Sequence, residues 1–263
     1  MMVMLGVLFM LMLFGILQSS NAAAAGSPVK LHSAEINYFT ERGAVVGYNV
    51  QGYVTVEEDQ TVGFMTINYA YDYSNWQDVK AKFIGRTDGK QLWYFETDKK
   101  EVYPYKYFNY KCELAVKYEA DNQISWDNNH GQNYFLQHKS VGSEYIDRPY
   151  ILAGTKVKAV NISDYYKNKE KEDIYLRGKI VLENLAYDKE VEVIYSCDNW
   201  QTRQRVEARY VSGYENNLEE WSFKLPNIKA GATVNYIVLY RANGETYWDS
   251  SFAKSYEHQV DLD

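Results

Sequence analysis

Residues Trp126 to Tyr134 place an aromatic side chain next to several carboxamides, in the order Trp-Asp-Asn-Asn-His-Gly-Gln-Asn-Tyr. A tryptophan can cover the apolar C–H face of a sugar ring, while Asn and Gln side chains hydrogen-bond its hydroxyl groups. A second segment, Trp248 to Tyr256, keeps only the Trp, the Asp and the Tyr in register with the first. Both segments are therefore candidates for a ligand site.

The two segments belong to a wider internal similarity. The chain has 6 tryptophans, and they form the pairs Trp76 with Trp200, Trp93 with Trp221, and Trp126 with Trp248. Around the first pair, Asn-Trp-Gln occurs twice, and the following residues also match. The spacing between partners drifts slightly, as small loop insertions between strands of fixed length would cause. The sequence predicts a duplicated unit.

Residue composition and alternation favour strands in both copies. The 26 Tyr, 10 Phe and 6 Trp are strand-forming aromatics, and only 4 Pro are present. Apolar residues alternate with polar ones, as at Val191, Val193 and Tyr195, and turn signals such as Asn243-Gly244 separate the runs. We expect an all-β chain with two immunoglobulin-like β-sandwich modules in tandem. An open barrel is the alternative for each module.

The expected division of the chain has four parts. Residues 1–22 resemble a secretory signal peptide, because an uncharged apolar run is followed by small residues around Ala22. A retained membrane anchor is the alternative, although the apolar run is short for a span. Module 1 is expected at 29–136, a linker at 137–156 and module 2 at 157–260. We therefore predict a secreted protein without stable membrane association after cleavage.

Charge and cysteine content exclude several functions. The formal net charge is −7 and lysines and arginines are scattered, which argues against nucleic acid as a partner. Cys112 and Cys197 occupy different places in the two copies, so we expect independent thiols, one buried in a strand and one near a loop. No Cys/His metal spacing and no phosphate-binding glycine loop occurs in the sequence, so no cofactor is predicted.

The acidic residues do not suggest catalysis. Asp127 and Asp249 recur beside Trp126 and Trp248, but glycoside hydrolysis needs a second carboxyl group at a defined separation. No second acid recurs beside them, so a role in capping a turn is favoured. The asparagines of the first segment have two open interpretations, sugar contact or loop shaping. For Trp93 and Trp221, which lie in strand-like contexts, we predict burial in the core.

Three motifs of the second copy resemble family-21 carbohydrate-binding modules. They are Asn-Leu-Ala-Tyr-Asp-Lys-Glu-Val-Glu-Val from residue 184, Cys-Asp-Asn-Trp from residue 197, and Gly-Glu-Thr-Tyr-Trp-Asp from residue 244. The first copy resembles the family through the segment from Trp126 to Tyr134. The family includes the starch-binding domain of fungal glucoamylase and glycogen-targeting subunits of protein phosphatase 1.

The resemblance implies a β-sandwich that binds α-1,4-glucan without catalysis. The implied ligand residues are Trp76, Trp126, Asn128 and Asn133 in module 1, and Trp200 and Trp248, with Tyr187 and Lys189 as a smaller second site, in module 2. Two departures make the copies unequal. Gln60 stands opposite Tyr187, and serines 250 and 255 replace the two amides in module 2.

We therefore expect non-catalytic binding of a starch-like or glycogen-like α-glucan polysaccharide, with a separate amylolytic enzyme as a partner. One alternative is a glycogen-targeting scaffold for a protein phosphatase. The sequence contains no basic-x-Val/Ile-x-Phe/Trp docking segment of the kind such scaffolds carry, and the leader favours export. A second alternative is an accessory polysaccharide-active enzyme.

Overall fold

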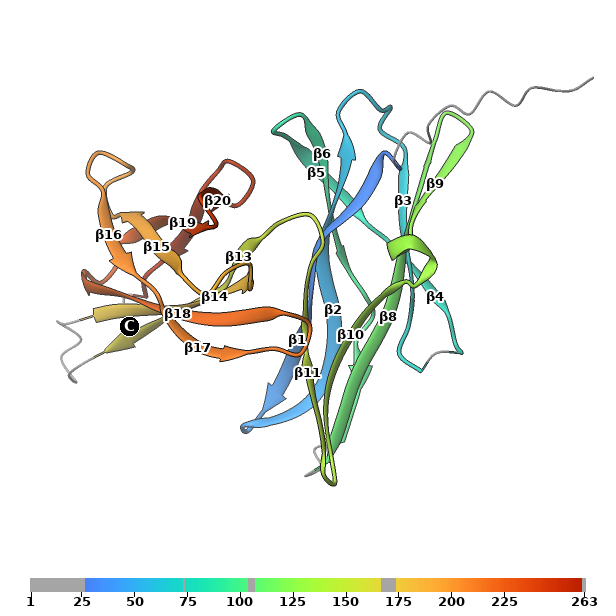
Figure 1. Ribbon diagram of the computed structural model, residues 1–263, viewed down its shortest axis with the longest axis horizontal. Helices are drawn as coiled ribbons and strands as arrows, with labels where there is room; N and C mark the ends of the chain where they lie inside the picture. Colours follow the sequence, from blue (N-terminus) through green and yellow to red (C-terminus); the bar gives the residue numbers. More distant parts are fainter. Residues whose placement is uncertain (1–26, 73, 104–106, 167–173, 262–263) are drawn as a thin grey trace, which may run out of the picture.

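The computed structural model describes residues 27–72, 74–103, 107–166 and 174–261, so the expected signal peptide lies outside the described residues. These ranges form strands and one short 3-10 helix, η1 (Asn129–Gly131), which confirms the all-β prediction. None of the described residues belongs to a helix that could span a bilayer. Figure 1 shows the strands gathered into two parts, which we call the first unit (residues 29–152) and the second unit (residues 157–260).

The first unit contains two six-stranded antiparallel sheets. The first sheet has the order β12-β1-β2-β6-β5, with β7 also paired to β2, and the second has the order β11-β10-β8-β3-β4, with β9 also paired to β8. The strands of the first sheet are β1 (Val29–Glu41), β2 (Ala44–Glu57), β5 (Lys82–Thr87), β6 (Lys90–Glu96), β7 (Lys100–Glu101) and β12 (Tyr150–Leu152). Those of the second are β3 (Phe64–Ala70), β4 (Gln77–Lys80), β8 (Phe108–Ala120), β9 (Gln123–Asp127), β10 (Tyr134–Val141) and β11 (Glu144–Arg148).

The second unit has a four-stranded sheet, β13-β14-β18-β17, and a five-stranded sheet, β16-β15-β19-β20 with β21 also paired to β19. Its strands are β13 (Val157–Tyr166), β14 (Ile174–Glu183), β15 (Lys189–Ser196), β16 (Gln204–Glu207), β17 (Arg209–Gly213), β18 (Leu218–Ile228), β19 (Thr233–Ala242), β20 (Glu245–Asp249) and β21 (Tyr256–Gln259). The order β1-β2-β6-β5 of the first unit thus recurs as β13-β14-β18-β17. That the units are immunoglobulin-like modules stays a prediction.

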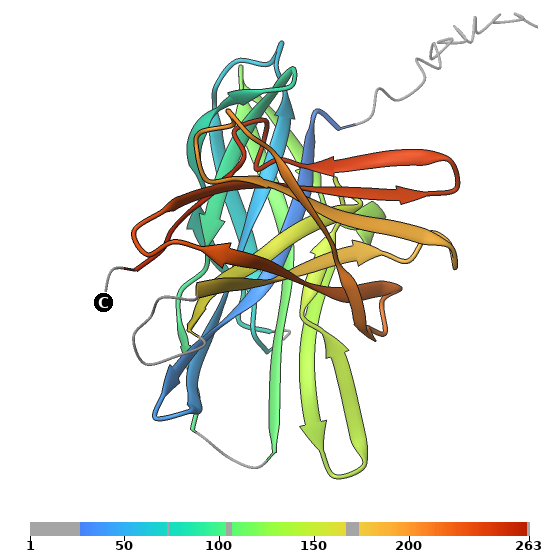
Figure 2. The ribbon, with the colours of Figure 1, turned by 90° about the vertical axis from the view of Figure 1, so that its left-hand side faces the viewer.

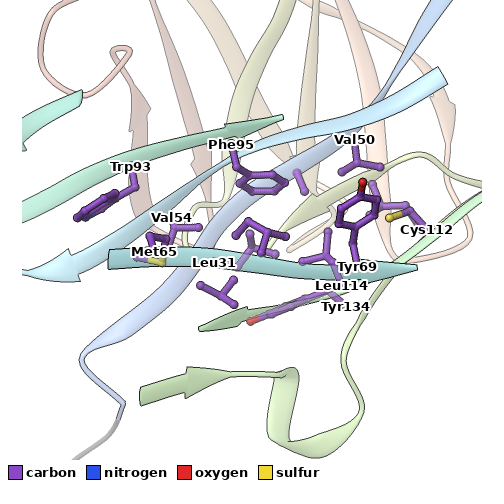
Figure 3. Close-up of a cluster of buried hydrophobic side chains, with 14 of the residues drawn as sticks. Leu31, Val50, Val54, Met65, Tyr69, Trp93, Phe95, Cys112, Leu114 and Tyr134 are labelled. Carbon is purple, nitrogen blue, oxygen red and sulfur yellow. The ribbon is translucent and has the colours of Figure 1, made fainter. Parts of the chain in front are cut away.

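Each unit has its own hydrophobic core, built by alternation along the strands. In β8, Cys112, Leu114 and Val116 are fully buried while Lys111 and Glu113 point away from the core. Figure 3 shows such side chains from both sheets of the first unit meeting in one layer. Burying each large aliphatic side chain stabilises the fold by about 1.5–3 kcal/mol. A separate cluster fills the second unit.

The prediction of burial is confirmed for Trp93 and only in part for Trp221, and the predictions for the two cysteines are confirmed. Trp93 is buried, and Trp221 is half-buried and packs against the second core. Cys112 is buried in β8 and Cys197 is exposed beyond β15, and both are free thiols. Burial raises the pKa of the Cys112 thiol, which keeps it protonated and unreactive.

The segment expected to be a linker, residues 137–156, largely joins the first unit as strands. It contains the end of β10, all of β11, which pairs with β10, and all of β12, which pairs with β1. These strands are short and half-exposed, so they show little alternation in sequence. After β12 the chain bends closely over β1, since a Cβ added at Gly154 would lie 2.9 Å from the His32 Cα. Only glycine, which has no Cβ, allows the chain to pass so close to β1.

The two units touch at a joint centred on Phe252. Its ring lies 4.8 Å from the His32 ring and 5.0 Å from the Tyr53 ring, and its carbonyl accepts a hydrogen bond from the Thr87 hydroxyl at 2.9 Å. Burial, helped by nearby Lys158, lowers the pKa of His32 to about 4. The joint therefore holds a neutral histidine between the units at physiological pH.

A second contact involves the turn between β17 and β18, which reaches the first unit in Figure 1. The Glu215 amide donates to the Asp147 carbonyl at 3.2 Å, and the Asn216 side chain donates to the Tyr150 carbonyl at 2.8 Å. The rings of Tyr150 and Tyr214 pack with their centroids 5.4 Å apart. The strands of the two units run in crossing directions, as Figures 1 and 2 show. Two separate contacts thus resist rotation of one unit against the other.

Candidate functional site

The aspartate of each Trp-Asp-Tyr segment acts as a structural clamp. Asp127 ends β9, and its Oδ2 accepts hydrogen bonds from the Leu31 amide at 2.6 Å and from the Tyr134 hydroxyl at 2.9 Å. Its Oδ1 also accepts from the Asn129 amide at 3.4 Å, within the turn that follows. The carboxylate therefore ties the turn to β1 of the other sheet.

Asp249 repeats this arrangement in the second unit. Its Oδ2 accepts from the Ala159 amide at 2.6 Å and from the Tyr256 hydroxyl at 2.7 Å, and its Oδ1 accepts from the Ser251 amide at 3.3 Å. Desolvation of this carboxyl raises its pKa, against the opposing effect of the hydrogen bonds. The predicted capping role is thus confirmed for both aspartates, and each also has a longer-range bond that the sequence did not indicate.

The turns after these aspartates have the same backbone form. In the first, the Asn133 amide donates to the Asn128 carbonyl at 2.8 Å, and in the second the Ser255 amide donates to the Ser250 carbonyl at 2.8 Å. Three successive residues in each turn have positive φ, namely Asn129, His130 and Gly131 in the first and Ser251, Phe252 and Ala253 in the second. The two segments differ in side chains and agree in conformation.

The asparagines predicted as ligands help to shape the first turn. Asn128 Oδ1 accepts a hydrogen bond from the Gly131 amide at 3.0 Å. Asn133 has φ 57° and donates from Nδ2 to Glu113 at 2.6 Å. Of the two interpretations left open by the sequence, these bonds support loop shaping. Sugar contact by Asn128 and Asn133 stays a prediction.

Trp126 and Trp248 are exposed on the outer faces of their sheets. Trp126 pairs with Lys117, whose neighbours on β8 face the core, so the indole points outward and is 45% exposed. Trp248 pairs with Leu239 in the same way and is 52% exposed. Neither indole closes a core, and each offers an open aromatic surface.

Trp76 and Trp200 do not occupy equivalent positions, although both lie in Asn-Trp-Gln sequences. Tyr69 pairs with Gln77 across β3 and β4, whereas Tyr195 pairs with Gln204 across β15 and β16. Trp76 therefore lies immediately before Gln77, the first residue of β4. In the second unit, three residues separate Trp200 from Gln204, the first residue of β16. The longer loop of the second unit carries the tryptophan further from the strand than ungapped alignment predicts.

An aspartate closes each of these loops. Asp72 accepts a hydrogen bond from the Asn75 amide at 2.9 Å, and this bond is the main reason that the pKa of Asp72 falls to about 2. Asp198 accepts from the Ser196 hydroxyl at 2.6 Å and from the Thr202 amide at 2.9 Å, and these bonds also lower its pKa to about 2. The loop positions are therefore set by charge-assisted hydrogen bonds.

The backbone at Trp200 is strained. Trp200 has φ 67° and Asn199 has φ 54°, a conformation that bulky residues rarely adopt. The Ser196 hydroxyl accepts from the Trp200 amide at 2.9 Å and holds the residue there. Such strain often accompanies a functional role, because the surroundings must compensate for about 1–3 kcal/mol. Trp76 shows no positive φ.

Tyr187 and Lys189, predicted as a second small site, differ sharply in environment. Tyr187 is 98% exposed and borders a shallow pocket with Asn243. The Lys189 side chain is only 5% exposed, and its ammonium donates to both carboxylate oxygens of Glu219 at 2.9 Å. The lysine is therefore held in a buried ion pair, and the tyrosine is the more accessible of the two.

Sequence reasoning missed three residues of these regions. Glu219 pairs with Lys189 and also accepts from the Trp221 indole at 2.9 Å. Asp72 and Asp198 recur before the two Trp loops, and this recurrence was the signal that could have identified them. Among the described residues, no group of three or more His, Cys, Asp or Glu side chains could hold a metal ion.

Comparisons with known proteins find a family match within the second unit. Residues 155–259 match the carbohydrate/starch-binding module of family 21. Protein phosphatase 1 regulatory subunit 3B of Xenopus tropicalis is 23% identical over 171 residues, covering 60% of this chain and 54% of that protein. The subunit 3B of Homo sapiens is 24% identical over 141 residues, covering 52% and 47%.

The chain thus spans about half the length of these curated relatives. Among solved structures, the carbohydrate binding module of the muscle glycogen-targeting subunit of Protein Phosphatase-1 is 23% identical. It covers 40% of this chain and 76% of its own, with a TM-score of 0.34. The match to residues 155–259 supports the resemblance noted for the second copy, and the same assignment for the first copy stays a prediction.

Proposed function

We propose that the second unit binds a glycogen-like or starch-like α-glucan without catalysis, through Trp200, Trp248 and Tyr187. The observation that carries this proposal is the strained, half-buried Trp200, fixed by Ser196 inside the region that matches the family-21 module. A flat indole removes the C–H face of glucose from water and leaves the hydroxyl rim free. At ~25 cal/mol per Å2, covering roughly 50–100 Å2 gives about 1–2.5 kcal/mol per sugar.

The first unit adds a second, weaker glucan site in this proposal. Trp76 and Trp126 are both exposed, and the sheets around them repeat the strand order of the second unit. Trp76 lacks the strained support of Trp200, and the position of Tyr187 is taken by Gln60. Two sites on one polymer raise the overall affinity through effective concentration, by about 10²-fold or more where the geometry lets both engage.

Of the two binding roles that the sequence left open, the comparisons favour the targeting role over a free-standing glucan binder. The relatives are regulatory subunits of protein phosphatase 1, so we propose that this chain brings such a phosphatase to the glucan. The given sequence contains no basic-x-Val/Ile-x-Phe/Trp docking segment. Export remains a prediction that rests on the leader, and an amylolytic partner remains a prediction that rests on the resemblance to starch-binding modules.

An enzymatic role has less support. Asp127 and Asp249 directly follow the exposed Trp126 and Trp248, and each carboxylate accepts bonds from backbone amides and a tyrosine. A carboxyl group that serves as a clamp in this way is not free to protonate a glycosidic oxygen. We therefore propose a non-catalytic protein.

Co-sedimentation with insoluble starch and with glycogen tests both parts of the proposal, with cellulose and chitin as controls. We expect Trp200→Ala to reduce retention by about tenfold and Trp76→Ala to reduce it less, because each loses one aromatic contact. Phe64→Ala removes another exposed aromatic ring outside the proposed sites and serves as the matched control. Circular dichroism verifies folding.

The same assay is repeated with the catalytic subunit of protein phosphatase 1. This subunit should reach the glycogen pellet only when the chain is present. A folded protein that stays in the supernatant with both starch and glycogen would refute glucan binding. Retention of the chain without the phosphatase would refute only the targeting role.

A further inference from the structure

A groove lies between the two units, away from the exposed tryptophans. Its walls come from η1 and the start of β10 in the first unit, from β12, and from the β17–β18 turn and the end of β14 in the second. Phe135, Ile151, Leu152 and Leu218 supply an apolar lining. The groove therefore exists only because the joint and the β17–β18 contact hold the units together.

Three asparagines give the groove an unusual set of polar atoms. Asn129, Asn216 and Asn217 all line it. Each donates from Nδ2 to a backbone carbonyl, namely Asn129 to Asn133 at 3.0 Å, Asn216 to Tyr150 at 2.8 Å and Asn217 to Asn184 at 3.3 Å. Because a carbonyl can only accept, these bonds fix the orientation of all three amides. Each side-chain nitrogen thereby uses one of its two N–H groups.

The side-chain oxygens of the three asparagines lack such hydrogen bonds. Asn216 Oδ1 is buried and has no hydrogen-bond partner among the described residues. No described residue donates to Asn129 Oδ1 or Asn217 Oδ1 either. Because Asn216 Oδ1 is enclosed, the acceptors open to a ligand are those of Asn129, which is half-buried, and Asn217, which is exposed. The groove thus presents neutral acceptors beside an apolar wall.

The chemistry of the groove selects a neutral polyol. Unpartnered amide oxygens would repel an anion, and the charged groups at the edge, Lys156 and Glu183, form an ion pair with each other. Sugar hydroxyls are donors, and the C–H faces of a pyranose fit against Phe135 and Leu218. We propose that the groove binds glucose units of an α-glucan, a third subsite formed jointly by both units. This inference rests on the proposed function.

The test removes two of the acceptors at positions that tolerate glycine. Asn129 and Asn217 have φ 50° and 60°, where glycine is favourable. The double variant Asn129→Gly, Asn217→Gly also loses the side-chain bonds to the Asn133 and Asn184 carbonyls, so circular dichroism and thermal unfolding first verify that it folds. The matched control is Asn122→Gly, Asn227→Gly, at exposed positions with φ 59° and 57° outside the groove lining. Calorimetric titration of the full chain uses maltoheptaose, an α-1,4-linked glucose heptamer, with cellohexaose as the negative probe.

We expect about tenfold weaker maltoheptaose binding at the groove for the double variant and no change for the control. Hydrogen exchange adds a readout on the wild-type chain, in which maltoheptaose should protect amides 129–135 and 215–218. If maltoheptaose binds but neither the affinity of the double variant nor exchange in these segments changes, the groove inference is overturned and the proposed function stands. If the wild-type chain does not bind maltoheptaose, both fail together.

Discussion

The turns that follow Asp127 and Asp249 adopt the same backbone conformation. The conformational free energy that this backbone costs differs greatly between the residues of the two turns. The first uses Asn129, His130 and Gly131 for three successive positive φ angles, and asparagine and glycine are the residues that tolerate this region best. The second uses Ser251, Phe252 and Ala253 at φ 47°, 59° and 65°. A bulky residue in this region is disfavoured by about 1–2 kcal/mol.

The contacts of the two turns explain the difference. His130 is exposed at the tip of the first turn, whereas Phe252 packs against His32 and Tyr53 of the other unit. The unfavourable φ of the second turn is thus compensated by burial between the units. The same framework therefore serves as an open surface loop in one copy and as a joint in the other.

The largest expected effect comes from removing the clamp that both turns share. Asp127→Ala and Asp249→Ala should each lower the free energy of unfolding by about 3 kcal/mol, because two amides and a tyrosine hydroxyl lose a charged acceptor. Urea unfolding followed by circular dichroism measures the loss. Tyr134→Phe and Tyr256→Phe remove one bond each and should cost about 1 kcal/mol. Equal losses for Asp and Tyr variants would contradict the clamp.

Phe252→Ala should cost about 2 kcal/mol, whereas His130→Ala at the matching position should cost little, since only the former removes packing between the units. The pKa of His32, about 4 in the intact joint, should rise toward its ordinary value of 6.5 as water enters. NMR titration of the His32 ring measures this shift.

The sign of the pH effect follows from linkage. A lowered pKa in the folded state means that His32 supports folding fully above pH 6.5, and that this support is lost as pH falls from 6.5 toward 4. The Phe252→Ala variant should therefore lose less stability on acidification than the parent chain. An unchanged His32 titration in Phe252→Ala would show that other groups, not the Phe252 ring, keep water from the histidine.

The smallest effect concerns backbone strain alone. Gly131 has φ 88° and no atom within 4 Å of an added Cβ, so Gly131→Ala should cost about 1 kcal/mol through conformation only. Ala253→Gly should stabilise the chain by roughly 0.5–1 kcal/mol for the opposite reason. Thermal unfolding measures both. The comparison of the turns fails if the two substitutions change stability in the same direction.

Local patterns were enough to predict much of this architecture. Alternation in β8 and β15 identified strands and the buried Cys112, and the recurrence of Asp127 and Asp249 beside tryptophans identified the turn caps. These features depend on neighbours within a few positions. Their physical cause is therefore visible in a short stretch of sequence.

Features that depend on distant residues could not be predicted. The register of Gln77 and Gln204 displaced Trp200 from the position suggested by matching Asn-Trp-Gln segments. Lys189 is paired with Glu219, which is 30 positions away in sequence and close only because β15 and β18, in different sheets, approach each other in the fold. Strand β12 was not recognised because three residues at a sheet edge carry too little alternation to reveal their pairing with β1.

The Phe252 joint restricts which polymer shapes can contact both units at the same time. A loose tether lets two binding surfaces adapt to many spacings, so the second attachment depends only gradually on tether length. Two crossing units locked by the Phe252 ring and the Asn216 side chain present their surfaces at one spacing and one tilt. Under the proposed function, the chain would bind most tightly to glucans whose curvature places sugars at both surfaces at once. It would therefore discriminate between polymers by shape as well as by sugar chemistry.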